Sequence, residues 1–134
     1  MAAERELDPE IWIHYLHHGD VQALAMSDAE IISAVEDGLR AQGLGQVTIE
    51  PRMHLAPKAG VDGHFNVLRG AIGAPINLAG VKVVGDFVDN YKQDLPSELG
   101  VLNLFDPRTG VPVAIIDASA ITDMRTGAVT AIGA

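Results

Sequence analysis

The sequence contains no cysteine among its 134 residues. This absence excludes disulfide bonds, thiol nucleophiles and thiolate metal ligands, and it suits a reducing compartment. Residues 1–10 are charged where a signal peptide would be apolar, and no stretch of the sequence approaches the length of a membrane-spanning helix. We therefore expect a soluble, cytoplasmic protein with no membrane partner.

Basic and aromatic residues are also scarce. Nine Lys and Arg stand against 18 Asp and Glu, which gives a formal net charge of −9, and aromatic residues make up 4% of the chain. Nucleic-acid surfaces need clustered Lys and Arg, and none cluster here, so we expect no nucleic-acid partner. The hydrophobic content of 48% and the length together predict one globular domain of ordinary size.

The common catalytic and cofactor motifs are missing as well. Residues 69–77 contain a GxxG pattern, but they lie among predicted strands and lack the glycine-rich turn between strand and helix that binds dinucleotides. The five histidines include no pair with the helical spacing and nearby glutamate of zinc hydrolases, and no serine stands in a nucleophile elbow. These patterns predict no metal site and no Ser-His-Asp set.

The first third of the chain combines strand and helix patterns. Residues 11–16 have an apolar period of two, typical of a short strand, and a short helical segment follows at residues 20–26. Ser27 and Glu30 form a capping box that starts a second helix, which glycines end near residue 43. Its apolar residues recur at three- and four-residue steps, so we expect it to pack on a sheet; they are Ile31, Ile32, Val35 and Leu39.

From residue 47 the pattern changes to β segments separated by glycine and proline. The turn sequence DPRTG at residues 106–110 predicts a hairpin. After Asp117 the pattern becomes helical, with small residues throughout and an apolar face that includes Met124 and Ala128. The chain is thus predicted to be an α+β fold, a mixed β-sheet with packed helices. We expect strands at residues 52–56, 64–71, 79–86, 98–105 and 111–117.

Three basic residues are candidates for a site. Arg52 starts a predicted strand and is either a solvated edge residue or a ligand contact. Lys82 lies among valines in a strand predicted to be buried on both faces, where an ammonium is costly unless it snorkels to water or meets a carboxylate. Burial would also lower its pKa toward the range of proton exchange. Arg125 lies in the first turns of a small-residue helix, where it either binds a phosphate or carboxylate or pairs with Asp123 or Asp117.

Four segments follow one another in a distinctive order and spacing: GVK, LPS, TGVP and finally DASAITDMRT, which ends in Arg125 and Thr126. This series, within residues 80–134, resembles the ornithine cyclodeaminase/mu-crystallin family. The family pattern runs Gly-Val-Lys, Leu-Pro-Thr, a Thr-Gly-x-Pro hairpin and then Asp-x-x-x-(Leu/Ile)-Thr-x-x-Arg-Thr. Upstream, the capping-box helix and the segment PRMHL fall where the family has its first long helix and a Pro-Pro-Arg strand.

The resemblance implies part of a two-domain enzyme. Residues 1–118 would form a substrate-binding and dimerisation domain, and residues 119–134 would begin the helix that links it to a Rossmann domain for NAD or NADP, which would lie beyond residue 134. Members of the family transfer hydride between a nicotinamide and the Cα of an amino acid or imino acid, as imine reductases, amino-acid dehydrogenases or ornithine cyclodeaminases. We expect this chain to be the N-terminal part of such an oxidoreductase, homodimeric and inactive alone.

The resemblance also implies roles for single residues. Arg52 and Lys82 match ligands of the substrate carboxylate, and Lys82 matches the catalytic residue that exchanges a proton at the imine nitrogen. Arg125 matches an arginine at the cofactor phosphates, Thr126 follows it, and Ser97 stands where the family has a threonine near the cofactor.

One segment departs from the family pattern. Residues 85–97 replace a stretch rich in Asn, Pro and Gly, so the side-chain end of the substrate pocket is not predicted. Two other hypotheses remain beside the oxidoreductase. The chain could be a non-catalytic dimeric binding module for a small carboxylate ligand, or a structural protein without a ligand.

Overall fold

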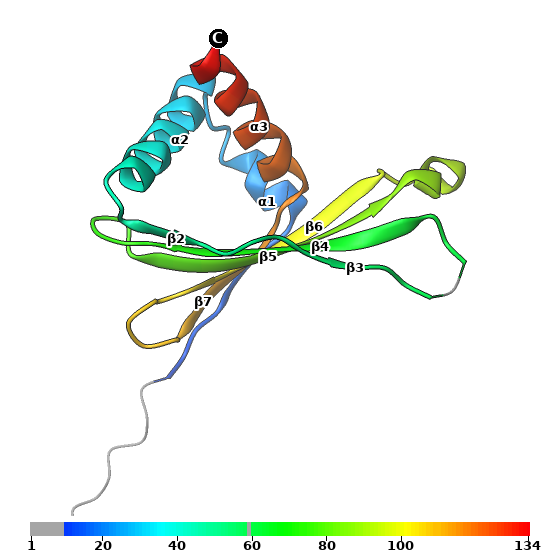
Figure 1. Cartoon of the computed structure of the whole chain (residues 1–134), viewed down its shortest axis with the longest axis horizontal. Helices are drawn as coiled ribbons and strands as arrows, with labels where there is room; N and C mark the ends of the chain where they lie inside the picture. Colours follow the sequence, from blue (N-terminus) through cyan, green and yellow to red (C-terminus); the bar gives the residue numbers. More distant parts are fainter. Residues whose placement is uncertain (1–9, 59) are drawn as a thin grey trace, which may run out of the picture.

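Residues 10–58 and 60–134, which the computed structural model describes, form one mixed sheet of seven strands and three α-helices that lie on one side of it (Figure 1). The strand order is β1-β7-β6-β5-β4-β2, and β3 also pairs with β4. The predicted α+β fold is confirmed. The strands are β1 (His14–Leu16), β2 (Val47–Ile49), β3 (Met53–Leu55), β4 (Gly63–Ile72), β5 (Leu78–Phe87), β6 (Glu98–Phe105) and β7 (Pro112–Asp117). The helices are α1 (His18–Ala23), α2 (Asp28–Gly43) and α3 (Ser119–Gly133), with a 3-10 helix, η1, at Val88–Gln93.

The sheet is built around the long antiparallel hairpin of β4 and β5, which pair along their whole length. Strands β6 and β7 extend it in antiparallel order, and β1 joins β7 in parallel, which makes the sheet mixed. The predicted hairpin between β6 and β7 is confirmed. Gly110 has a φ of 74°, which suits glycine, and its N–H donates to the carbonyl of Asp106 at 2.8 Å.

Alternation of side chains gives the sheet a helix-facing side and an open side. Lys82 of β5 belongs to the helix-facing side, because its Nζ donates to the hydroxyl of Thr122 in α3. Its neighbours Val81 and Val83 therefore belong to the open side. The buried apolar side chains of the described residues lie in the helices, in strands β5 and β7, and just before α3; they are Val21, Ala41, Val84, Ala114, Ala118 and Ala128.

Helix α2 begins and ends as predicted. The hydroxyl of Ser27 accepts a hydrogen bond from the N–H of Glu30 at 3.3 Å, and the Glu30 carboxylate accepts one from the N–H of Ser27 at 2.8 Å. The sequence predicted that this helix packs on the sheet, but the sheet provides only a minor part of its contacts. The helix packs chiefly against α3, and Ile31 and Ile32 share a hollow with Met124 and Ala128. Small residues along α3 allow this close helix pairing.

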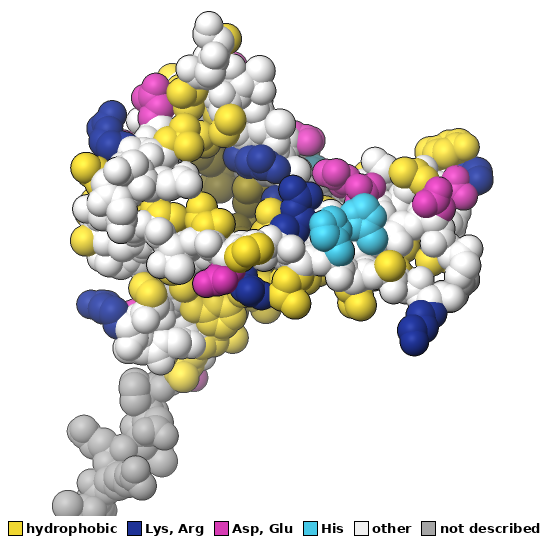
Figure 2. Space-filling model, viewed as in Figure 1, with side chains coloured by type: hydrophobic (Ala, Val, Ile, Leu, Met, Phe, Trp, Pro, Cys, Tyr) yellow, Lys and Arg dark blue, Asp and Glu magenta, His cyan; other side chains and the backbone are white. Residues whose placement is uncertain are grey.

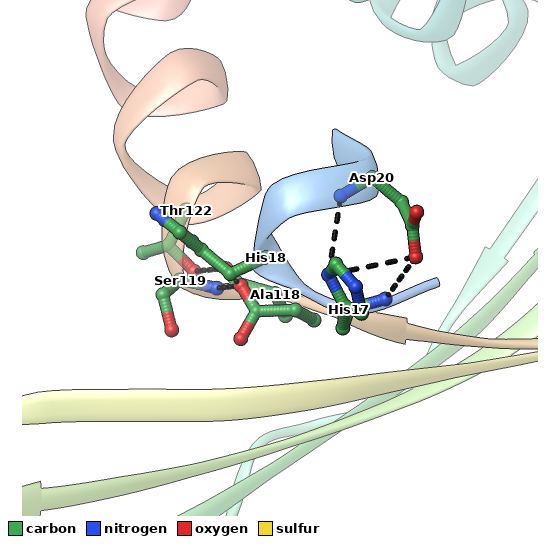
Figure 3. A network of polar contacts seen from close by, with 7 residues as sticks. His17, His18, Asp20, Ala118, Ser119 and Thr122 are labelled. Carbon is green, nitrogen blue, oxygen red and sulfur yellow. Dashed lines mark hydrogen bonds and ion pairs between the residues drawn. The ribbon is translucent and has the colours of Figure 1, made fainter. Parts of the chain in front are cut away.

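Several boundaries differ from the sequence predictions. Helix α1 starts at His18, because His17 caps it: the His17 Nδ1 accepts from the N–H of Asp20 at 3.2 Å (Figure 3). Histidine is not a usual N-cap, so sequence rules do not mark this start. Strand β1 covers only the second half of the predicted 11–16 segment. Strand β2 and helix η1 are not predicted.

We expect replacement by alanine to change the stability of the protein in opposite directions at two glycines. A Cβ at Gly70 in β4 would lie 2.8 Å from the carbonyl oxygen of Thr48 in β2, whereas a Cβ at Gly38 in α2 would meet nothing within 4 Å. We expect Gly70→Ala to lower the free energy of unfolding by about 1–3 kcal/mol through overpacking. Gly38→Ala should raise it by about 1 kcal/mol, since glycine disfavours helix. Urea denaturation measures both, and equal stability of the two variants would contradict the close pairing of β2 with β4.

Candidate functional site

Arg52, Lys82 and Arg125 come together from three separate parts of the fold. Lys82 lies in β5 and Arg125 in α3, while Arg52 immediately precedes β3, whose pairing with β4 brings it level with the partner of Lys82 in the sheet. They line one cavity of about 80 Å³ between the sheet and α3, together with Asn66, Leu68, Val84, Glu98 and Thr122. Figure 2 shows Lys and Arg side chains gathered at a hollow between helices and sheet, beside histidine.

Lys82 is held by a hydroxyl rather than by a carboxylate. Its Nζ donates to Thr122 Oγ1 at 3.2 Å, and that hydroxyl donates in turn to the carbonyl oxygen of Ala118 at 2.8 Å. Burial lowers the pKa of Lys82, and so do the charges of Arg125 and Arg52, while Glu98 opposes the shift. A lysine with a lowered pKa can give up and take back a proton more readily than a solvated one.

Neither arginine of the cavity is neutralised by a carboxylate within the described residues. The sequence alternative that pairs Arg125 with Asp123 or Asp117 is wrong, since the Asp117 carboxylate instead contacts His18 Nδ1 at 3.4 Å and accepts from the N–H of Ser119 at 3.1 Å. Both arginines are exposed, so their charges are available to a ligand. The arrangement is chemically suited to a small anion such as a carboxylate.

Asn66 is a site residue that sequence reasoning missed. It is 8% exposed, and its amide Nδ2 donates to His64 Nε2 at 3.2 Å. Its Oδ1 is buried and has no hydrogen-bond partner in the described part of the chain. Buried acceptors are rarely left without a donor. No local sequence signal marks it, because its place on the side of Lys82 follows from the register of β4 with β5, in which Asn66 lies opposite Val84.

Glu98 and Thr122 were also missed. Thr122 stands inside the quoted family motif, one helical turn before Arg125, so helical spacing places both side chains on one face. Glu98, Thr122 and Val84 also line a second, larger hollow of about 440 Å³ that extends toward His18 and Asp123. The small cationic cavity therefore adjoins room for a larger ligand.

Ser97 and Thr126 do not line the cavity. The Thr126 hydroxyl donates to the carbonyl of Thr122 at 2.7 Å within its own helix, and the Ser97 carbonyl accepts from the N–H of Phe87 at 2.9 Å. Both residues are exposed. Of the three residues that the resemblance assigns to a cofactor, Arg125 alone lines the cavity, and its guanidinium is suited to a phosphate as well as to a carboxylate.

Within residues 10–58 and 60–134, no group of three or more His, Asp or Glu is arranged to hold a metal ion. No helix in the same ranges has the length and apolar character needed to cross a membrane.

The fold and the site thus define an α+β domain with a cationic cavity between its sheet and helix α3. The chain belongs to the ornithine cyclodeaminase/mu-crystallin family, whose model matches residues 14–134. The resemblance drawn from the sequence is confirmed, and the match also includes the upstream helices, where the motifs were weaker.

Three relatives illustrate the family. The chain is 32% identical over 115 residues to an alanine dehydrogenase of Archaeoglobus fulgidus, which covers 86% of this chain and 34% of that protein. Its fold is similar to that of a Δ1-pyrroline-2-carboxylate reductase of Thermococcus litoralis, solved with NADH and L-proline, with a TM-score of 0.81 and 30% identity. That match covers 88% of this chain and 36% of the reductase. The fold is also similar to that of an archaeal alanine dehydrogenase dimer with bound NAD, with a TM-score of 0.78 and 29% identity. That match covers 87% of this chain and 34% of the dehydrogenase chain. The chain spans about a third of the length of these relatives.

The lowered pKa of Lys82 predicts a stability effect with a defined pH dependence. Because its pKa in the folded protein lies below 10.5, the cost of burying the ammonium is fully present at neutral pH and is relieved as pH rises toward that value. We expect Lys82→Met to raise the free energy of unfolding at pH 7 by up to about 1 kcal/mol, allowing for solvent at this half-buried group. The gain over the parent protein should shrink as pH increases.

Lys92→Met is the matched control for this change. Lys92 is exposed and pairs with Asp89 at 2.8 Å, so the same change of net charge should alter stability by less than about 0.5 kcal/mol. Denaturant unfolding at several pH values measures both variants. A Lys82→Met protein that is less stable than the parent at neutral pH would contradict the cost assigned to this lysine.

Proposed function

We propose that this chain is the substrate-binding part of an NAD(P)-dependent oxidoreductase that acts on the Cα–N bond of an amino acid or imino acid. Residues 1–118 would form the substrate-binding and dimerisation domain, and residues 119–134 would begin the helix toward a nucleotide-binding domain. The observation that carries the proposal is the convergence of Arg52, Lys82 and Arg125 on one cavity. The relatives named above act on alanine or a pyrroline carboxylate, which supports this class of substrate.

The cations of the cavity would bind the substrate carboxylate. Two guanidinium groups and an ammonium offset its charge, orient the neighbouring Cα and exclude water from it. Lys82, whose pKa is lowered by burial, would exchange the proton at the substrate nitrogen. A bound nicotinamide would supply or accept the hydride.

Arg125 is the best-supported cofactor contact, because its exposed guanidinium stands at the cavity and can also reach a phosphate. Ser97 and Thr126 are proposed as weaker contacts on the surrounding surface. The sequence contains no glycine-rich dinucleotide turn. We therefore expect these 134 residues alone to bind the substrate without turning it over.

Binding of a small carboxylate tests the proposal. We expect L-proline to shift the NMR signals of residues around the cavity, and Arg52→Gln and Lys82→Met each to weaken binding about tenfold or more, since each removes a charge-assisted contact. Arg40→Gln is the matched control, because Arg40 lies on α2 beside Asp37, away from the cavity. An effect of Arg40→Gln equal to that of Arg52→Gln would mean that binding is unspecific.

The same protein is then supplied with NADH and an imino acid. Turnover at ordinary enzymatic rates would show that hydride transfer needs nothing outside these residues, against the proposal. The chain is also tested when joined to a nucleotide-binding domain. If it then binds the carboxylate tightly and NADH does not change that affinity, the result would favour the non-catalytic binding module.

We also propose that the open side of the sheet binds a second copy of this chain. This side carries exposed apolar residues on β1, β3 and β6, among them Tyr15 at 70%, Leu55 at 63% and Val101 at 44% exposed. Extended apolar surface of this kind marks an interaction site. The occupant is a second copy because the archaeal alanine dehydrogenase of the same fold is a dimer.

A charge on this side should prevent the association. Val101→Lys puts an ammonium beside Asp117, its partner in β7, so the folded monomer tolerates it while the apolar contact is lost. We expect the parent chain to sediment as a dimer and Val101→Lys as a monomer in analytical ultracentrifugation. Val129→Lys is the control on α3, 45% exposed in the parent and on the helix side, and it should remain dimeric. A dimeric Val101→Lys protein would place the interface elsewhere.

A further inference from the structure

The amide of Asn66 has a fixed orientation at the cavity. Its Nδ2 donates to His64 Nε2 at 3.2 Å, and because an amide nitrogen can only donate, the imidazole nitrogen accepts. The Oδ1 is then left as the free end of the side chain. It is buried without a partner in the described residues, and the residue, 8% exposed, lines the cationic cavity.

A free acceptor beside a carboxylate-binding cluster specifies a ligand. The cavity is lined by the positive charges of Arg52, Lys82 and Arg125, by the carboxylate of Glu98, and by Asn66, whose side chain carries the unpartnered neutral acceptor. A ligand that satisfies the cations and this acceptor carries an N–H group next to its carboxylate, as an α-amino or cyclic imino acid does. A ligand with oxygen at that position places two acceptors against each other and leaves the buried oxygen unsatisfied.

We propose that Asn66 is a specificity-determining residue that selects ligands bearing N–H beside the carboxylate, and that His64 is the positioning residue that turns its carbonyl oxygen toward the cavity. The inference rests on the proposed function, since it assumes that the cations hold the carboxylate. It adds the means by which this chain discriminates amino and imino acids from 2-hydroxy and 2-oxo acids.

Two planar carboxylates of similar size test the proposal on the intact 134-residue chain. Pyrrole-2-carboxylate has N–H beside the carboxylate, and furan-2-carboxylate has an ether oxygen in the same place. We expect the chain to bind the pyrrole compound about tenfold or more tightly, because only it satisfies the buried acceptor. Calorimetric titration gives both dissociation constants, and the ratio of the two is the readout.

Substitutions separate selection from general damage. Asn66→Leu has a similar shape and no acceptor, so the ratio should fall to about one. His64→Phe frees the amide to rotate, so the ratio should fall as well, whereas His54→Phe should leave it unchanged. His54 is the matched control, since its ring lies 5.3 Å from that of His64 and makes no hydrogen bond to Asn66.

Asn66→Asp shows whether His64 acts through orientation. A carboxylate has acceptors on both oxygens and no donor, so it keeps the preference for N–H whichever way it turns. In the Asn66→Asp background, His64→Phe should therefore leave the ratio unchanged. A structural role of His64 would lower affinity in both backgrounds without this difference in selectivity.

Each outcome has a distinct meaning. Equal binding of both compounds by the parent would overturn the role of Asn66 and leave the carboxylate site intact. Binding of neither compound would overturn the carboxylate site and this inference with it. A ratio unaffected by Asn66→Leu, in a variant whose circular dichroism matches the parent, would place the selecting acceptor elsewhere.

Discussion

The geometry of the cationic cavity depends on how the ammonium of Lys82 is held between the sheet and helix α3. Its Nζ donates to the Thr122 hydroxyl at 3.2 Å, and that hydroxyl donates to the carbonyl of Ala118 at 2.8 Å. The N–H of Ala118, a fully buried residue, donates to the carbonyl of Gly100 at 2.9 Å. These contacts join β5, α3 and β6 in one series. Because a partly buried charge is stable only with polar partners, the place of the helix and the place of the cation depend on each other.

Small residues make this close approach possible. A Cβ at Gly100 would lie 3.0 Å from both the carbonyl oxygen and a methyl group of the neighbouring strand β5, so the strand leaves no room for a side chain where α3 begins. Ala118, just before α3, and Ala128, within it, are both buried. Larger residues would fill more of the core, but they would lift Thr122 and Arg125 away from Lys82. The modest packing of this layer is thus the condition under which the cavity exists.

The sequence predicted the elements with strong local patterns and the residues with unusual chemistry. The α2 helix followed from its capping box and the β6–β7 hairpin from its turn, because both are set by residues within a few positions of each other. Lys82 was identifiable as a charge among valines. Asn66 was not, since its importance depends on strand register and on a histidine two residues away, and an unsatisfied acceptor exists only in three dimensions. The partner of α2 was mistaken for the same reason, because an apolar stripe does not reveal which surface covers it.

The two sides of the sheet carry different kinds of side chain, because residues alternate between them along each strand. The helix-facing side holds Lys82, Asn66 and the ends of two arginines, so only part of it, including Val84 and Ala114, is available for apolar burial. No large side chain among the described residues is completely buried there. Apolar side chains are instead displayed on the open side, where Val101 and Leu55 remain in contact with water. A domain that uses its inner layer for charged groups gains most from covering its outer layer. The proposed dimer contact and the proposed ligand site would therefore be linked through the sheet, because association would stabilise the strands that fix the spacing of the cationic cavity.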